Sequence, residues 1–114
     1  MRPDGWELRL AEALRTASKS EFDARRWNCA MFARHCAMAV SGRDIPARWL
    51  GSLEATADAV LTRVDVRRAQ RGDIVLAPVP EPSLGVCVGR KAMFMTSKGL
   101  TPYPMRRARI AWSV

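Results

Sequence analysis

The segment RWNCAMFARHC contains the residue best suited to chemistry, Cys29. Asn28 precedes it and is a good helix N-cap, so the apolar residues that follow predict a helix beginning beside the thiol. Free backbone N–H groups and the helix dipole favour a thiolate at such a position, which would make Cys29 half of a nucleophilic pair. The alternative is that Cys29 is a small apolar residue of a core.

A nucleophilic cysteine also needs a base, and the chain contains one histidine, His35. His35 follows Cys29 by six positions, which on a helix is about 240° of rotation and about 9 Å of rise. Its imidazole cannot reach the Cys29 thiol from the same helix. We therefore expect His35 on the helix surface or facing a partner.

The three cysteines, Cys29, Cys36 and Cys87, do not form a disulfide framework, which suits a reducing compartment. Their spacing with a lone histidine matches no common zinc pattern, so we predict neither a metal site nor a cofactor. Cys36 and Cys87 are expected to be small buried residues.

The chain has 114 residues and a formal net charge of +8, which suits one domain with one core and a basic surface. No apolar run approaches a signal peptide or a membrane span, so we expect a soluble, unexported domain. The arginines are scattered apart from two clusters, Arg67-Arg68-Arg71 and Arg106-Arg107-Arg109. Because no aromatic residues interleave with them, a protein interface is favoured over a nucleic-acid surface.

Hydrophobic periodicity divides the chain into a helical part of about residues 4–64 and a strand-rich part of about 72–114. We expect helices over 4–18, 28–40 and about 52–63, capped by Asp4, Asn28 and Ser52. Gly42 would end the second helix, and Pro46 breaks the loop after it. Short strands are expected over 74–76, 84–88, 92–96, 100–103 and 110–112. The predicted fold is a single α+β domain, residues 1–114, in which N-terminal helices precede a small antiparallel sheet of four or five strands.

Two further features have local interpretations beside functional ones. Asp73 follows Gly72 at the start of a strand, where turn formation explains it better than catalysis does. The tripeptide Arg71-Gly72-Asp73 is a chance match to an integrin-binding sequence.

Trp27, Trp49 and Trp112 are expected to close the core around the cysteine helix, unless one of them anchors an interface.

The capped cysteine helix WNCAMFA, the later strands RGDIVL and LGVCVG, and the hairpins after them resemble the NlpC-type, papain-like peptidoglycan hydrolases. The resemblance covers most of residues 25–114 and is closest to short phage proteins of this fold encoded among tail-tip genes. Those proteins share the GRDxxARW-like loop, a GL…P turn and a closing AW+V strand. The resemblance implies a papain-like domain in the tail of a bacteriophage.

This resemblance assigns Cys29 to the nucleophile position, with Asn28 where the family has aspartate. The catalytic histidine would fall near Ser83, which cannot act as a base near neutral pH. Glu81 could substitute only if its loop folded inwards and its carboxyl group stayed protonated to higher pH. The orienting residue would fall within 93–95, which offers no polar side chain. Two of three catalytic roles are therefore empty, and the domain resembles a degenerate hydrolase.

The expected function is that of a structural component of a phage tail tip or baseplate, made in the host cytoplasm and located in the virion. Its partners would be other tail proteins (a hub, distal tail or central tail-tip protein), with no small-molecule ligand. Arg106, Arg107 and Arg109 are the candidate partner-facing edge, or else a solvated strand edge kept from aggregating by charge. Two alternatives stay open: a peptidoglycan-cleaving cysteine hydrolase using Cys29, and a basic nucleic-acid-binding module.

Overall fold

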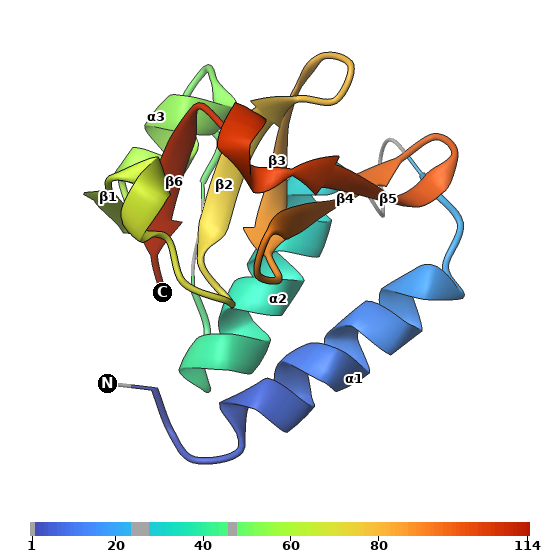
Figure 1. Cartoon of the computed structure of the whole chain (residues 1–114), viewed down its shortest axis with the longest axis vertical. Helices are drawn as coiled ribbons and strands as arrows, with labels where there is room; N and C mark the ends of the chain where they lie inside the picture. Colours follow the sequence, from blue (N-terminus) through green and yellow to red (C-terminus); the bar gives the residue numbers. More distant parts are fainter. Residues whose placement is uncertain (1, 24–27, 46–47) are drawn as a thin grey trace.

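A computed structural model gives the fold of residues 2–23, 28–45 and 48–114 (Figure 1). Within these residues the helices are α1 (Trp6–Ser18), α2 (Cys29–Ser41) and α3 (Leu53–Asp58). The strands are β1 (Thr62–Val64), β2 (Ile74–Pro78), β3 (Pro82–Cys87), β4 (Lys91–Thr96), β5 (Gly99–Pro104) and β6 (Ile110–Ser113). Two 3-10 helices, η1 (Val66–Arg68) and η2 (Met105–Arg107), follow β1 and β5. The α+β class is confirmed.

The strands form one sheet in the order β1-β6-β2-β3-β4-β5, and every neighbouring pair is antiparallel. Strands β2 to β5 are a meander of hairpins, after which the chain returns and places β6 between β2 and β1. The sheet thus has six strands in the described part of the chain, not four or five. Strand β1 accounts for the difference, because it lies inside the part that the sequence predicts to be helical.

The side chains of the sheet alternate between two apolar clusters, as expected for pleated strands. Ile74 on β2 belongs to the cluster on the helix side, and its neighbour Val75 to the cluster on the opposite face. In Figure 1, α1 and α2 lie together on the helix side. The helix-side cluster includes Leu10, Ala13, Ala17, Phe32, Ala33, Cys36, Val40, Leu84, Val86, Met95 and Trp112. The opposite-face cluster consists of Val75, Ala77, Cys87, Ala92, Phe94, Met105 and Ala111.

The two 3-10 helices lie against the opposite face of the sheet. Met105 of η2 is buried in the opposite-face cluster, and Val66 of η1 packs against the same cluster. Helix η1 contacts η2 because β1 pairs antiparallel with β6, so the residues that follow β1 lie beside those that precede β6. This neighbourhood matters for the surface described below.

The helix ends test the predicted caps. The side chain of Asn28 accepts a 3.0 Å hydrogen bond from a backbone N–H in the first turn of α2, and Gly42, with φ 72°, ends that helix. Ser52 caps α3 in the same way. The prediction for α1 is wrong, because its N-cap is Gly5, with φ 81°, and not Asp4. A positive φ favours glycine at this position.

The third helix is shorter than predicted, and its C-terminal side explains why. Helix α3 ends at Asp58, and residues 62–64 instead pair with β6 as strand β1. Arg63 on β1 reaches back to α3, with its Nε 2.8 Å from Asp58 Oδ1 and its Nη2 2.7 Å from Glu54 Oε2. Trp112 on β6 donates its indole N–H to Asp58 Oδ1 at 2.9 Å. These contacts hold α3 against the edge of the sheet.

Asp58 makes the stability of this corner dependent on pH. The hydrogen bonds from Arg63 and then Trp112 lower the pKa of its carboxyl group from 3.8 to about 2. A carboxylate whose pKa is lower in the folded chain stabilises the fold above its unfolded pKa, and this contribution is lost as the pH falls. We therefore expect the melting temperature to fall between about pH 5 and pH 2, and Asp58→Asn to flatten that fall. Thermal unfolding followed by circular dichroism measures both, with Asp44→Asn as the exposed control; equal slopes for all three proteins would contradict the assignment.

The tryptophans do not all behave as the sequence predicts. Trp112 is fully buried in the helix-side cluster, as expected. The prediction that Trp49 belongs to the core is wrong, because 63% of its surface is exposed and it lies at the rim of a pocket. Trp27 and the predicted breaker Pro46 lie outside the described residues.

Candidate functional site

Cys29 is the first residue of α2 and is half-buried, whereas Cys36 and Cys87 are buried. Burial raises the pKa of the Cys36 thiol to about 12, and burial likewise raises the pKa of Cys87. The predictions for these two cysteines are confirmed. His35 is exposed on α2, also as predicted, and lies well along the helix from its N-terminus.

The burial of two thiols and the partial exposure of the third predict selective alkylation. Near neutral pH, iodoacetamide should modify Cys29 at least about a hundredfold faster than Cys36 or Cys87, which react only when the structure opens. Peptide mass spectrometry after timed labelling measures the three rates in one sample. Labelling in urea is the control, since unfolding should equalise the rates. Equal rates in the native protein would contradict the placement of Cys29.

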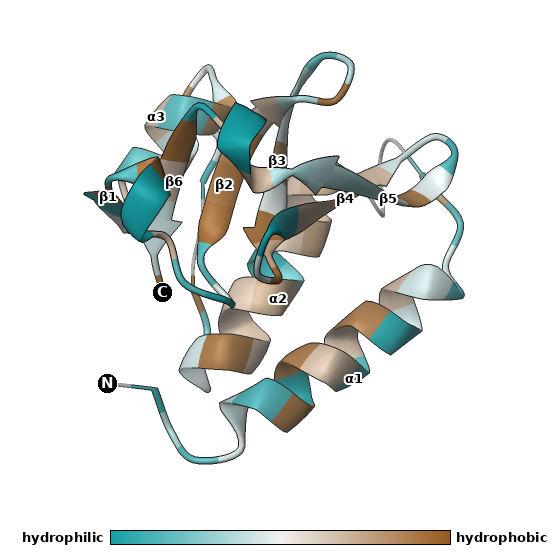
Figure 2. Ribbon diagram, in the orientation of Figure 1, coloured by the Kyte–Doolittle hydropathy of each residue, from teal (hydrophilic) through white to brown (hydrophobic). Residues whose placement is uncertain are grey.

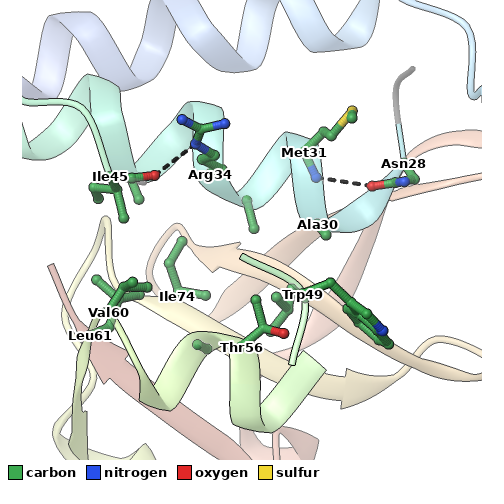
Figure 3. A pocket seen from close by; sticks show the side chains of 14 residues that line it. Asn28, Ala30, Met31, Arg34, Ile45, Trp49, Thr56, Val60, Leu61 and Ile74 are labelled. Carbon is green, nitrogen blue, oxygen red and sulfur yellow. Dashed lines mark hydrogen bonds between the residues drawn. The ribbon is translucent and has the colours of Figure 1, made fainter. Parts of the chain in front are cut away.

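An apolar pocket of about 270 Å³ lies next to Cys29, between α2, α3 and the start of β2 (Figure 3). Asn28 and Ala30, the residues on either side of Cys29, both line it. Small side chains on the pocket face of α2 leave the space open: Ala30, Ala33 and Ala37. Figure 3 shows Ile74 between the two helices and Trp49 at the edge of the pocket.

The polar side chains that line the pocket are Asn28, Arg34 and Thr56, and each has a structural partner. Asn28 caps α2. Arg34 donates from its Nε to the carbonyl of Ile45 at 2.8 Å and forms a 2.9 Å ion pair with Asp44. The Thr56 hydroxyl donates to the backbone carbonyl of Ser52, the N-cap residue of α3, at 2.7 Å. The lining residues in the described part of the chain include no imidazole and no carboxylate, so the pocket supplies no base to a thiol beside it.

The position that the resemblance gives to the catalytic histidine is occupied by Ser83, on β3. Its side chain is buried, and its hydroxyl donates to the backbone carbonyl of Glu81 at 2.9 Å, within the β2–β3 hairpin. Glu81 itself is exposed, so its side chain does not meet the condition under which it could replace a histidine. Residues 93–95 on β4 are Met, Phe and Met, and the last two are buried. These positions therefore offer no side chain that could act as the catalytic base and none that could orient it.

Asp73 is a structural residue, as its local interpretation predicts. Its carboxylate is buried, with Oδ1 2.7 Å from Arg2 Nη2 and Oδ2 accepting the backbone N–H of Gln70 at 2.8 Å. Oδ1 also accepts the backbone N–H of Val114 at 3.2 Å. The tripeptide that ends in Asp73 cannot present this carboxylate to a receptor, because only 4% of the residue is exposed.

Arg106, Arg107 and Arg109, the candidate partner-facing edge, are all exposed. The structure adds two residues that sequence reasoning treated as a separate cluster, Arg67 and Arg68 on η1. They are exposed as well, and η1 lies beside η2. No local pattern in the sequence indicates this neighbourhood, because it depends on the pairing of β1 with β6, which are far apart in the sequence.

Metal sites and membrane-spanning helices are two other classes of feature that the described residues do not provide. No group of three or more His, Cys, Asp or Glu side chains in residues 2–23, 28–45 and 48–114 could hold a metal ion. Among the helices in these ranges, none combines the length and the apolar character that crossing a membrane requires.

The fold and the site define a class of protein: a small α+β domain in which a cysteine opens a helix packed on an antiparallel sheet, beside an apolar pocket. The chain belongs to the DUF6950 family, which is described as a domain of unknown function. The family model matches residues 1–55 and 50–114, and so covers both the helices and the sheet. No curated protein matches the chain.

Proposed function

We propose that the chain is a structural component of a bacteriophage tail tip or baseplate, built on a catalytically degenerate NlpC-type, papain-like domain. In this proposal it resides in the virion, where it binds neighbouring tail proteins. The observation that carries the proposal is the burial and hydrogen bonding of the Ser83 side chain. A buried hydroxyl that is hydrogen-bonded within its own hairpin stands where a hydrolase of this type needs an imidazole.

The rest of the site supports a binding role for the same fold. A cysteine hydrolase needs a base within about 3 Å of the sulfur, and usually a third group that orients the base. The pocket beside Cys29 is lined by apolar groups and by polar side chains that already have structural partners. Cys29 can then be retained as a small residue at the start of α2 without acting as a nucleophile.

The exposed arginines provide the surface through which the domain would bind its neighbours. Arg106 and Arg107 lie on η2 and Arg109 follows it, so all three project from a segment held by the buried Met105. Arginine is enriched at protein interfaces because its planar head group forms several hydrogen bonds at once. An ordered backbone beneath exposed arginines lowers the entropy that is lost on docking.

One observation favours a second candidate function, a cysteine hydrolase acting on peptidoglycan. Cys29 is the half-buried cysteine of the three, it begins a helix, and both of its chain neighbours line the pocket. In this alternative the base comes from a neighbouring subunit. Purified protein would then release soluble peptidoglycan fragments, and Cys29→Ala would abolish the release.

Quantitative mass spectrometry of purified tails from the phage that encodes the chain tests the proposed function. We expect the chain at a fixed ratio to the known tail proteins through successive gradients, and tails of altered structure when its gene is deleted. A chain absent from the particles, together with fragment release that depends on Cys29, would contradict the proposal and support the hydrolase.

A further inference from the structure

Five exposed arginines form one continuous basic surface, which we call the arginine surface. It consists of Arg67 and Arg68 on η1, Arg106 and Arg107 on η2, and Arg109 before β6. The two 3-10 helices lie beside each other, and Figure 2 shows both as hydrophilic segments on the same side of the molecule. Two clusters that are far apart in the sequence therefore act as one surface.

The arginine surface is short of compensating negative charge. Asp65 caps η1 through a 2.8 Å hydrogen bond to the backbone N–H of Arg67, and its carboxylate lies 3.2 Å from the Arg67 guanidinium. In the described part of the chain, no ion pair joins a carboxylate to the other four arginines. Unpaired guanidinium groups held close together repel one another, and a partner that carries carboxylates relieves this repulsion.

A shallow hollow between η1, η2 and the start of β6 gives the arginine surface a shape. Its walls include Arg67, Arg106 and Arg109. Its floor is formed by half-buried aliphatic residues that pack against the opposite-face cluster: Val64, Val66 and Ala108. A charged rim around an apolar floor is the arrangement of a protein interface, where an apolar centre is enclosed by polar contacts.

These features favour a protein over a nucleic acid as the partner. None of the described residues that line the hollow is aromatic, so bases have no stacking platform there. An acidic peptide can place its carboxylates on the arginines while an aliphatic side chain covers the floor.

We propose that the arginine surface binds an acidic segment of a neighbouring protein, with carboxylates paired to arginines from both η1 and η2 and an aliphatic side chain over the hollow. This inference rests on the proposed function, because the neighbouring protein would be a tail protein. It goes further by naming the chemistry of the partner and by assigning Arg67 and Arg68 to the interface.

Fluorescence anisotropy with defined probes tests this proposal in solution. The probes are a labelled peptide of repeated Glu-Glu-Leu and a labelled single-stranded DNA of the same net charge. We expect the peptide to bind more tightly than the DNA, and binding to weaken as salt is added. Tighter binding of the DNA, or no binding of the peptide at low salt, would overturn the proposal.

Paired charge reversals identify the surface. Arg67→Glu with Arg68→Glu, and Arg106→Glu with Arg107→Glu, should each weaken peptide binding by about tenfold or more. The control is Arg43→Glu with Lys98→Glu, which makes the same change in net charge at exposed positions outside the surface and should cost about twofold at most. Unchanged melting temperatures would show that all three variants are folded. If the variant with Arg67→Glu and Arg68→Glu bound the peptide as tightly as the unmodified chain, η1 would not be part of the binding surface, and the proposal of one continuous surface would be contradicted.

The same variants separate this inference from the proposed function. If the chain is found in tails but the Arg67→Glu, Arg68→Glu variant is incorporated normally, the arginine surface is wrong and the proposed function stands. If the chain is absent from tails while the peptide still binds, the proposed function fails and the arginine surface stands.

Discussion

Asp73→Ala should lower the free energy of unfolding by about 3 kcal/mol, because it removes the acceptor at the centre of a buried polar cluster. The Asp73 carboxylate joins Arg2 near the N-terminal end, Gln70 before β2 and Val114 after β6. Arg2 also donates to the carbonyls of Val114 and Arg71, at 3.0 and 2.6 Å. Without the carboxylate, a largely buried guanidinium and two backbone N–H groups lose their acceptor, and each such loss is costly.

Urea denaturation followed by tryptophan fluorescence measures this loss. The matched control is Asp44→Ala, which removes the carboxylate of an exposed ion pair with Arg34 and should cost less than about 1 kcal/mol. A loss below about 1 kcal/mol for Asp73→Ala would mean that the cluster contributes little to stability.

Gly85→Ala should be about as damaging, by about 3 kcal/mol, for a steric reason. Gly85 lies on β3 between Val75 and Phe94 on the neighbouring strands. A Cβ atom at this position would clash with the backbone oxygen of Met93 and would lie 2.6 Å from the Phe94 ring. Backbone cannot move aside as a flexible side chain can, so β3 and β4 must separate.

The control for this substitution is Gly51→Ala. Gly51 has open space around it and a φ of 92°, so alanine there meets backbone strain of about 1 kcal/mol without a steric clash. Thermal unfolding and soluble yield should both rank Gly85→Ala well below Gly51→Ala. The reverse order would show that the β3–β4 pairing adjusts easily at this point.

The sequence was sufficient where short-range rules act. The caps Asn28 and Ser52 and the helix end at Gly42 were predicted from residue type and spacing alone, because capping depends on neighbours within one turn. The burial of Cys36 and Cys87 followed from their apolar surroundings. The sheet was predicted in type but one strand short.

Errors arose where distant parts of the chain meet. Residues 62–64 continue a plausible helical pattern, and they become a strand because β6 offers them hydrogen bonds from the far end of the sequence. Trp49 suits a core by its type, yet the small alanines on α2 leave a pocket that it borders.

The candidate site shows the same division. Cys29 and the arginines after β5 are candidates that the sequence itself names; the structure places Cys29 half-buried at the start of α2 and leaves the arginines exposed. The joining of Arg67 and Arg68 to those arginines depends on the pairing of β1 with β6, and the apolar pocket beside Cys29 depends on the packing of α3. The DUF6950 assignment leaves the role in a phage tail as our proposal.

The most direct measurement of the central claim is the yield of infectious particles from a phage that lacks the gene and is complemented with variants of the chain. Cys29→Ala should restore the titre to within about twofold of the unmodified chain, because in the proposed function no step in assembly or infection uses the thiol. Arg106→Glu with Arg107→Glu should lower it by about tenfold or more, because the domain no longer docks. The opposite pair of results would contradict the account and point to a working cysteine nucleophile. In that case Cys29→Ala would give complete, tailed particles that fail to infect, and the arginine variant would give a normal titre.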